Sequence, residues 1–230
     1  MYKNLKIYAF IPARGGSKRI PRKNLQLLAG KPLIRYTIDA AIKASVFRKV
    51  IVSTDDLEIE KISEDAGAEV LKRPPELARD TSTTIDTILH SIDEYGLNPE
   101  DIIILLQPTS PLRNDKHIKE ALDIYISCNG SPLVSVTKPD HSPYWSYRIK
   151  NNFLVPIMEK GQNTMRSQDL PDVYIPNGAI YISDVKTIVK NMTYFSKNTI
   201  PYYMKREESI DIDEYIDLKF AEFLIQNKFL

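Results

Sequence analysis

Cysteine and histidine are scarce in this 230-residue sequence. Cys128 is the only cysteine, so the chain cannot form an internal disulfide or a cysteine-ligated metal cluster. The three histidines, at positions 90, 117 and 141, lack the spacing of metal ligands. This composition excludes disulfide-stapled and zinc-cluster proteins, and it predicts a reducing compartment, the cytoplasm.

Long hydrophobic runs and a strong net charge are also missing. The longest apolar runs, residues 7–11 and 102–106, are too short for a signal-peptide core or a membrane span. The net charge is only +1, so a surface made to bind nucleic acid or membranes is not expected. With 43% hydrophobic residues, the chain is predicted to form one globular domain, residues 1–230.

Positive charge is nevertheless concentrated in one segment, residues 11–25 (IPARGGSKRIPRKNL), which is called the basic loop below. It holds five cations and no acid, and it follows an apolar run directly. Gly15 and Gly16 allow positive φ angles and a close approach of the backbone, so that amide groups can converge on oxygen atoms. Charge and glycines together predict an anion-binding loop.

Apolar runs alternate with helical patterns through the first two thirds of the chain. The candidate strands, rich in Ile, Val and Leu without polar alternation, are residues 6–11, 49–54, 68–71, 101–106 and 132–136. Candidate helices lie at 31–47 and 82–96, and the second carries a capping box of Thr83 and Asp86. The alternation predicts an α/β fold with a mainly parallel, doubly wound sheet.

The pattern changes between residues 139 and 175. This segment is rich in prolines and aromatic residues, and SPYWSYRI followed by NFLVPI predicts a two-stranded ribbon. Apolar residues on such a protrusion need a partner surface, so we expect a dimerisation arm that packs on a second copy. Strands are expected again at 178–183 and 200–205, and a final helix at 214–227.

The basic loop is the first strand-to-helix connection, which commonly holds phosphate in doubly wound folds. Arg14 and Lys23 can contribute full positive charge to a triphosphate. A Walker A motif is not matched, because Leu25 and Pro32 stand where it needs Gly and Ser or Thr, and no GxGxxG follows the first strand. The alternative is that the basic loop is a plain turn with a solvated cationic face. The position of the loop directly after the first strand favours phosphate binding.

Five sequence blocks carry a resemblance to a known family. They are IPARGGSKRIPRKN (11–24), VSTDD (52–56), LLQPTSPLR (105–113), PNGAIYI (176–182) and SIDID (209–213). With these blocks the sequence resembles the acylneuraminate cytidylyltransferases, the CMP-sialic acid synthetase family. The resemblance implies a Rossmann-like nucleotidyltransferase fold that joins CTP to a nine-carbon keto-sugar acid, uses Mg²⁺ and forms a homodimer.

The resemblance places CTP on the basic loop. Arg14 and Lys23 are expected to act in catalysis, because fixed cations stabilise the charge that develops at the α-phosphorus. Arg73 and Ser82 are assigned to the cytidine, although a surface cation before a Pro-Pro turn is the alternative for Arg73. The expected nucleotide-binding set is Ala13, Arg14, Gly16, Ser17, Lys23, Asn24, Arg73 and Ser82.

Polar residues after the most apolar strand suit a polyhydroxy sugar acid. Gln107, Thr109 and Ser110 supply an amide and two hydroxyls there, and a plain turn built by the flanking prolines is the alternative. The resemblance assigns further sugar contacts to Asn177, Tyr181, Tyr194 and Phe195. Ordinary strand and core packing is the alternative for these four residues.

Asp211 and Asp213 are the candidate Mg²⁺ ligands. In an extended chain, residues two apart point to one side, so both carboxylates can face one cation. Magnesium is commonly held by one or two carboxylates together with phosphate oxygens and water. Capping of the final helix is the alternative for Asp213, so Asp211 ranks first and is expected to be catalytic. The sequence offers no convincing general base.

Two positions depart from the family pattern. Trp145 stands where a lysine often follows the H-x-P of the arm, and Ser167 follows Arg166 where two adjacent arginines are common. Both changes affect residues that bind the sugar in this family, and the CTP-binding block is intact. We therefore expect a less hydroxylated diacetamido sugar such as legionaminic acid. Arg166 is then expected to bind the sugar carboxylate, reaching into the neighbouring subunit's cleft.

Three other functions remain open at this point. A Kdo cytidylyltransferase shares the reaction, but its first block typically lacks the GGSKRIPRKN wording. A non-catalytic nucleotide-sensing module is disfavoured by Lys23, Gln107 and Asp211. An RNA-binding protein is disfavoured by the neutral total charge.

Overall fold

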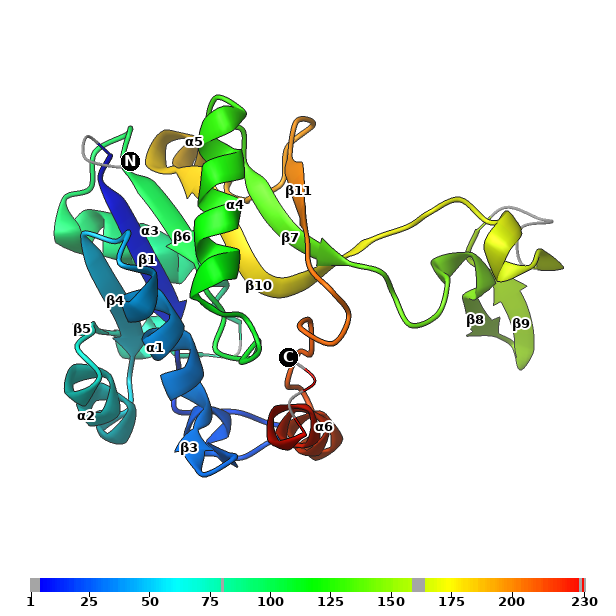
Figure 1. Cartoon of the computed structure of the whole chain (residues 1–230), viewed down its shortest axis with the longest axis horizontal. Coiled ribbons are helices and arrows are strands. Elements are labelled where there is room, and N and C mark those ends of the chain that lie inside the picture. Colours follow the sequence, from blue (N-terminus) through cyan, green and yellow to red (C-terminus); the bar gives the residue numbers. More distant parts are fainter. Residues whose placement is uncertain (1–4, 80, 159–163, 228, 230) are drawn as a thin grey trace.

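A seven-stranded sheet forms the centre of the protein, with the strand order β11-β7-β10-β6-β1-β4-β5 (Figure 1). The computed structural model describes residues 5–79, 81–158, 164–227 and 229. The strands of the sheet are β1 (Ile7–Pro12), β4 (Lys49–Thr54), β5 (Glu69–Lys72), β6 (Ile102–Leu105), β7 (Leu133–Thr137), β10 (Ile175–Asp184) and β11 (Ile200–Tyr203). The predicted α/β class and all seven expected strands are confirmed.

Strand β10 runs against its neighbours. It pairs antiparallel with both β6 and β7, whereas the other strand pairs of the sheet are parallel. The chain leaves β7 at the carboxyl edge of the sheet and comes back to the same edge at Ile175, so the next strand must run in the opposite direction. The mainly parallel sheet is confirmed, and this reversal is an addition to the prediction.

Helices cover both faces of the sheet. Side chains of α1 (Leu33–Ala44), α2 (Leu57–Asp65) and α4 (Asp115–Ser127) share one buried cluster, and those of α3 (Thr84–Tyr95) and α5 (Val185–Asn191) share another. Strand β1 joins both, because Ile7, Ala9 and Ile11 face the first cluster and Tyr8 and Phe10 the second. Burial on both faces explains why the strand lacks polar alternation.

Local side chains set the helix starts. The capping box of Thr83 and Asp86 is present, and α3 ends at Gly96 in the left-handed conformation (φ 56). Asp56 caps α2 and Asn114 caps α4, each accepting two backbone amides. These caps fix where the connections after the strands end, and the connections carry the polar side chains described below.

A third apolar cluster joins the C-terminal helix α6 (Tyr215–Gln226) to the basic loop. Ile20 of the loop and Ile212 are both fully buried there with Leu218 of α6. A small hairpin of β2 (Leu27–Leu28) and β3 (Lys31–Pro32) contributes Leu28 to the same cluster. This packing brings the segment around Ile212 beside the basic loop, 190 residues earlier in the chain.

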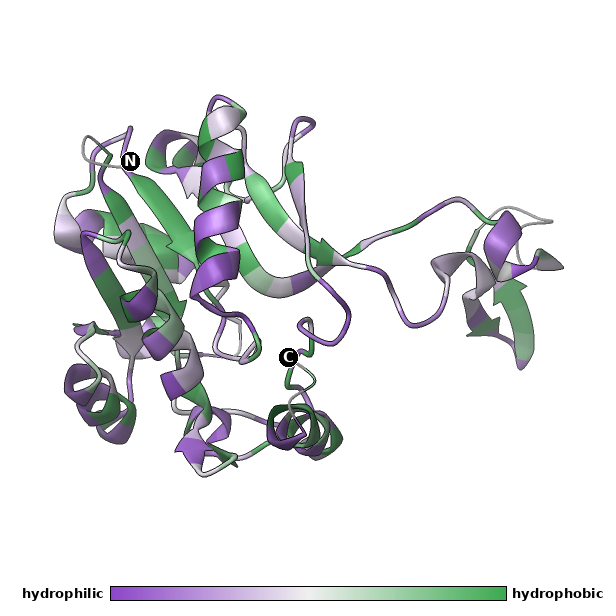
Figure 2. Cartoon of the chain, viewed as in Figure 1, coloured by the Kyte–Doolittle hydropathy of each residue, from purple (hydrophilic) through white to green (hydrophobic). Residues whose placement is uncertain are grey.

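The arm protrudes from the rest of the chain (Figure 1). It carries the predicted ribbon as β8 (Tyr147–Lys150) and β9 (Phe153–Pro156). Ile149, Phe153 and Leu154 are 76%, 74% and 69% exposed, and Figure 2 shows the hydrophobic colour of β9. Residues 159–163 of the expected arm lie outside the described residues, and packing on a second copy stays a prediction.

Among the helices of the described ranges, none reaches the length and apolarity needed to cross a lipid bilayer.

Candidate functional site

A cavity of about 420 Å³ opens at the carboxyl edge of the sheet. Its walls come from the basic loop, the connection after β5, the start of α3, the connection after β6 and the segment before α6. Eleven residues predicted from the sequence line it together: Arg14, Gly16, Ser17, Lys23, Asn24, Arg73, Ser82, Gln107, Thr109, Asp211 and Asp213. The fold therefore brings to one place both expected metal ligands, the expected nucleotide residues except Ala13, and Gln107 and Thr109 of the expected sugar residues.

The basic loop is held in shape by hydrogen bonds to its backbone. Asn24 Nδ2 donates to the carbonyl of Arg14 at 3.0 Å, and the amide of Gly15 donates to Asp55 Oδ1 at 2.9 Å. A Cβ atom on Gly15 would lie 2.8 Å from Asp56 Oδ2, so only glycine fits without a shift. Neither Gly15 nor Gly16 has a positive φ angle, so the close approach to Asp56 is what requires glycine at position 15.

Arg73 is buried at the back of the cavity. Its Nη2 donates to the carbonyl of Ser53 at 2.8 Å and its Nε to Ser53 Oγ at 3.2 Å. Burial lowers the pKa of Arg73, Asp55 opposes that shift, and the charge of Arg14 adds to it. The surface-cation alternative for Arg73 is therefore wrong, and Arg14 lies close enough to Arg73 to form a concentrated positive field.

Lys23 reaches across the cavity to the acidic segment. Its Nζ donates to the carbonyl of Ile212 at 2.7 Å and lies 3.2 Å from Asp213 Oδ1. Arg19 Nη1 lies 2.6 Å from the other oxygen of Asp213. Burial raises the pKa of Asp213, but Lys23 and Arg19 outweigh it and bring that pKa below its ordinary value.

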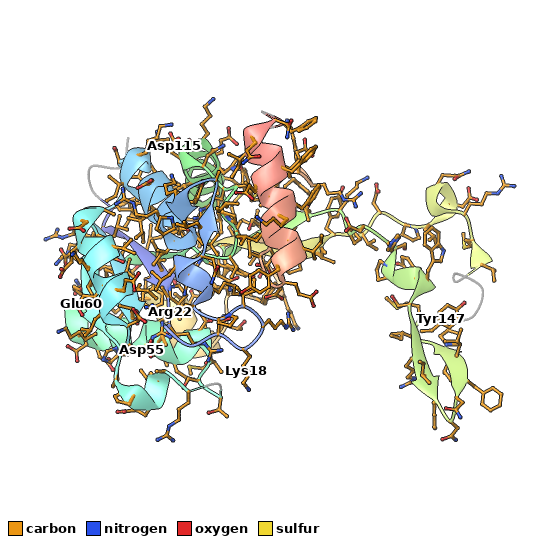
Figure 3. The ribbon with its side chains drawn as sticks, turned by 90° about the horizontal axis from the view of Figure 1, so that it is seen from below. Lys18, Arg22, Asp55, Glu60, Asp115 and Tyr147 are labelled. Carbon is orange, nitrogen blue, oxygen red and sulfur yellow. The ribbon has the colours of Figure 1, made fainter. Side chains whose placement is uncertain are left out.

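The remaining cations of the basic loop point elsewhere. Arg22 Nη2 pairs with Asp56 at 3.3 Å and with Glu58 at 2.9 Å, at the start of α2. Lys18 extends outward from the loop (Figure 3). Neither residue lines the cavity.

Asp211 faces the cavity from the segment before α6. Burial by the surrounding walls raises the pKa of Asp211, and a hydrogen bond with the Thr109 side chain offsets part of that rise. The amide of Ile212 donates to the Thr109 carbonyl at 2.8 Å, and because Ile212 points into the core, Asp211 and Asp213 both line the cavity. Glu214 caps α6, so the capping alternative for Asp213 is wrong.

Several predicted residues lie behind the cavity wall instead of on it. Ser110 and Asn177 are buried, and the Asn177 side chain bonds Ser135 Oγ at 2.6 Å and Ser209 Oγ at 2.9 Å. Ala13 is fully buried and its amide donates to the Ser53 carbonyl at 2.9 Å. These contacts favour a supporting role, in which buried residues hold the strands that carry the site.

The predicted aromatic residues form a group beside Asp211. The Tyr181 ring lies 5.6 Å from that of Tyr194 and 6.4 Å from that of Phe195. Burial raises the pKa of Tyr181 and the charge of Asp211 adds to it, so Tyr181 lies within electrostatic reach of that carboxylate. Tyr194 is buried in the core, as the packing alternative predicts, and Phe195 is 49% exposed.

Arg166 is the predicted residue that the structure places apart. It lies on the arm, is exposed, and does not line the cavity of its own chain. Its expected role depends on a second copy of the chain, which the structure does not contain.

Sequence analysis missed part of the lining. Thr83, Thr84 and Thr87, at the start of α3, add hydroxyls, and Arg79 lines the cavity where its carbonyl accepts Arg14 Nη1 at 3.4 Å. The run of threonines at a predicted helix start was the available signal, because parallel sheets place such starts at the carboxyl edge.

A second cavity of about 580 Å³ meets the first at Asp211. It lies between the base of the arm and α6, and Lys138, Arg206 and Phe220 are among its lining residues. Lys138 pairs with Asp172 at 2.9 Å, and Arg206 pairs with Asp140. Asp211 is therefore accessible from two sides.

The donor set around Asp211 fits Mg²⁺ only in part. Within the described ranges, no group of three or more His, Cys, Asp or Glu side chains could hold a metal ion. At phosphate sites, however, the protein usually supplies Mg²⁺ with only one or two carboxylate ligands, and phosphate oxygens and water molecules complete the coordination shell. Two carboxylates on one cavity wall match that requirement. Of the two carboxylates, Asp211 would be the more available to a cation, because Asp213 already pairs with Lys23 and Arg19.

Comparison with known proteins gives consistent matches. A family model described as cytidylyltransferase matches residues 8–230. The chain is 39% identical to an N-acylneuraminate cytidylyltransferase of Streptococcus agalactiae, over 91% of this chain and 51% of that protein, so it spans about half the length of this relative. It is 37% identical to a CMP-N,N'-diacetyllegionaminic acid synthase of Legionella pneumophila, over 96% of this chain and 97% of that protein.

Solved structures match at the level of the fold. A CMP:2-keto-3-deoxy-manno-octonic acid synthetase complexed with CTP superposes with a TM-score of 0.73 at 17% identity, over 97% of this chain and 99% of that one. A 4-diphosphocytidyl-2C-methyl-D-erythritol synthase of Anaerococcus prevotii gives 0.66 at 13% identity, over 96% of this chain and 99% of that one. These values show a shared nucleotidyltransferase architecture.

Proposed function

This chain belongs to the cytidylyltransferase family, and from that premise we propose that it joins CTP to a nine-carbon keto-sugar acid, giving a CMP-sugar and pyrophosphate. The main support for the proposal is that Arg14, Lys23 and Arg73 line the same cavity as Asp211. A triphosphate needs several fixed cations, and its transfer needs an acidic group that attracts a metal ion.

The chain's own residues explain how CTP would be held. Arg14 and Lys23 lie on opposite ends of the basic loop and can both meet phosphate oxygens, while the Gly16 backbone offers close approach. Lys23 now bonds Asp213, and an incoming phosphate competes for the same ammonium group. Arg73 and Ser82 lie on the wall after β5, where they suit the cytidine.

Asp211 is the residue that we assign to Mg²⁺, with Asp213 as an additional ligand. When bound there, Mg²⁺ would neutralise phosphate charge and acidify the attacking hydroxyl of the sugar. Thr109 keeps the Asp211 carboxylate oriented through its hydrogen bond and offsets part of the rise in pKa that burial causes, which helps the ionised form that a cation requires. Gln107 lines the cavity and would orient the sugar, with Tyr181 acting from behind the wall through its electrostatic interaction with Asp211.

A diacetamido sugar of the legionaminic type is the acceptor that we propose. The Legionella pneumophila relative matches this chain over nearly the whole length of both proteins, and its name specifies such a sugar. Trp145 and Ser167 replace the basic residues that the sialic acid enzymes commonly carry on the arm. An apolar ring near the acceptor suits acetamido and methyl groups better than additional hydroxyls.

A homodimer completes the site in this proposal. The exposed apolar face of β8 and β9 would pack on a second copy, and Arg166 would then meet the sugar carboxylate in the partner's cavity. The separation of Arg166 from its own cavity supports this arrangement.

The test is release of pyrophosphate from CTP with a panel of acceptors: N,N'-diacetyllegionaminic acid, N-acetylneuraminic acid and Kdo. We expect turnover with CTP and Mg²⁺, highest with the diacetamido sugar, and at least about tenfold less with UTP or ATP. Tight CTP binding without release for any acceptor would contradict the proposal and favour a nucleotide sensor. Highest turnover with Kdo would show that the acceptor is a Kdo-type sugar acid and not the proposed nine-carbon sugar acid.

A further inference from the structure

Arg113 is a cation buried beneath the candidate site. It ends the connection between β6 and α4, and the residue is 1% exposed. Burial lowers the pKa of its guanidinium to about 9. Within the part of the chain that the structure describes, no carboxylate pairs with it, and its Nε and Nη2 atoms have no hydrogen-bond partner. Burying an unpaired charge is unfavourable, and methionine would fill a similar volume without that penalty.

The guanidinium joins three backbone carbonyls. Its Nη1 donates to the oxygens of Gln107 at 3.3 Å, Ser110 at 3.4 Å and Ala179 at 3.3 Å. Gln107 and Ser110 each precede a proline, which has no amide hydrogen and keeps the preceding residue out of the helical conformation. The connection forms two tight turns instead of a helix, in which the Gln107 carbonyl accepts the Ser110 amide at 3.3 Å and the Ser110 carbonyl accepts the Arg113 amide at 3.4 Å. The Arg113 side chain adds a second donor to each carbonyl and links both to β10.

The opposite side of the same connection meets the cavity. Gln107 lines it, and its Oε1 rests where a Cβ on Gly178 of β10 would lie 2.8 Å away. The Thr109 carbonyl accepts the amide of Ile212 at 2.8 Å, and the Thr109 side chain hydrogen-bonds Asp211. The connection is thus held by Arg113 on its buried side and touches the acidic segment on its exposed side.

We propose that Arg113 is a positioning residue, which fixes the connection 107–113 on β10 and thereby sets where Thr109 holds the segment of Asp211. It touches neither substrate. CTP is bound mainly by the basic loop, so loss of Arg113 acts on the transfer step more than on nucleotide affinity. The kinetic part of this inference rests on the proposed cytidylyl transfer, and the structural part does not.

The test is Arg113→Met with two readouts. The first is hydrogen exchange of the Ile212 amide, which we expect to accelerate at least about tenfold when Thr109 is released. The Ile200 amide, which bonds the Pro132 carbonyl at 2.7 Å elsewhere in the sheet, is the internal reference and should keep its rate. The second is kinetics: a fall in kcat of about tenfold or more, with the CTP dissociation constant within about twofold of wild type.

Two further variants make the result interpretable. Arg113→Lys keeps the charge, but the lysine Nζ ends one bond short of the Nη1 position that bonds the three carbonyls, so we expect a smaller change of the same kind. Arg35→Met is the matched control, because Arg35 of α1 also has a buried Nε without a partner among the described residues and pairs with Asp39 at 3.2 Å, away from the cavity. It should behave as wild type in both readouts.

The outcomes separate this inference from the proposed function. If wild-type protein releases no pyrophosphate, the proposed function fails, and Ile212 exchange alone decides the role of Arg113. A folded Arg113→Met protein with wild-type Ile212 exchange overturns the inference. If that variant does not fold, unchanged Ile212 exchange and kcat in Arg113→Lys overturn it instead.

Discussion

The Nζ of Lys23 lies 3.2 Å from Asp213 Oδ1, although the two residues are 190 positions apart in the sequence. Ile20 and Ile212 share one apolar cluster beneath this contact, so core packing sets the distance between the loop and the acidic segment. A phosphate and a metal ion that bind to these two segments are consequently brought together by the fold itself.

Lys23→Met is expected to reduce kcat about 10² to 10³-fold while the protein stays folded. The ammonium group of the lysine bonds the Ile212 carbonyl and Asp213, and methionine keeps the apolar stem of the side chain. Steady-state pyrophosphate release and thermal denaturation measure the two effects. Lys186→Met, at a lysine of α5 that pairs with Glu100 at 3.0 Å, should leave kcat unchanged. Equal activity of both variants would remove Lys23 from the mechanism.

Asp211→Asn should abolish most Mg²⁺-dependent turnover, and Asp213→Asn should reduce it less. Asp213 is neutralised by Lys23 and Arg19, whereas Asp211 presents its carboxylate to the cavity with a hydrogen bond from Thr109. The measurement is kcat against Mg²⁺ concentration for both variants. The reverse order of severity would assign the metal to Asp213.

Gly15→Ala should destabilise the fold by about 1 to 2 kcal/mol and weaken CTP binding. Its new methyl group would lie 2.8 Å from Asp56 Oδ2, and Asp56 is fixed as the cap of α2. Gly16→Ala is the control for stability, because no atom lies within 4 Å of a Cβ there. Similar melting temperatures for the two variants would contradict the close-approach argument.

The free energy of unfolding should fall when the pH decreases from about 6.5 toward the lower folded pKa of His117. Burial depresses the pKa of His117, with Glu208 and Glu120 opposing the shift and Arg113 adding to it. The unfolded chain therefore takes up the proton first, and the full stability is present above about pH 6.5. Urea titrations between pH 7.5 and 5.5 should show a smaller slope for His117→Gln; equal slopes would exclude His117 as the cause.

Phe153→Asp should shift the protein toward the monomer. The ring is 74% exposed on β9, and a carboxylate there would oppose burial against a second copy. Light scattering coupled to size exclusion measures the mass of wild type and variant. Lys150→Glu, on the exposed neighbouring strand β8, is the control for a change of charge alone. A wild-type protein that is monomeric at micromolar concentration would contradict the dimer proposal.

Much of the fold could be predicted from the sequence because its cues are local. The strand cores, the capping box of Thr83 and the ribbon of β8 and β9 each depend on neighbouring residues. Helices α2, α4 and α5 were not singled out, although Asp56, Asn114 and Asp184 mark their starts. The reversal of β10 depends on where the arm leaves and returns, which no local pattern reveals.

The sequence predicted which residues belong to the site better than it predicted where each side chain lies. Eleven residues predicted from the sequence line the cavity, nine of them within the five blocks, but the sequence could not tell a lining residue from a supporting one. Ser110 follows strand β6 and Asn177 lies near the start of β10; both are polar, as lining residues are, and yet both are buried. The depth of a side chain depends on long-range packing, such as the contact of Gln107 with Gly178, and spacing along the chain does not encode it.

The most direct test of the account is the structure of the protein with CTP and Mn²⁺, with the metal located by its anomalous scattering. The account predicts phosphate oxygens within hydrogen-bond distance of Arg14 and Lys23, and the metal bound by Asp211 and a phosphate oxygen. A nucleotide bound outside this cavity, or a metal ion remote from Asp211, would contradict it.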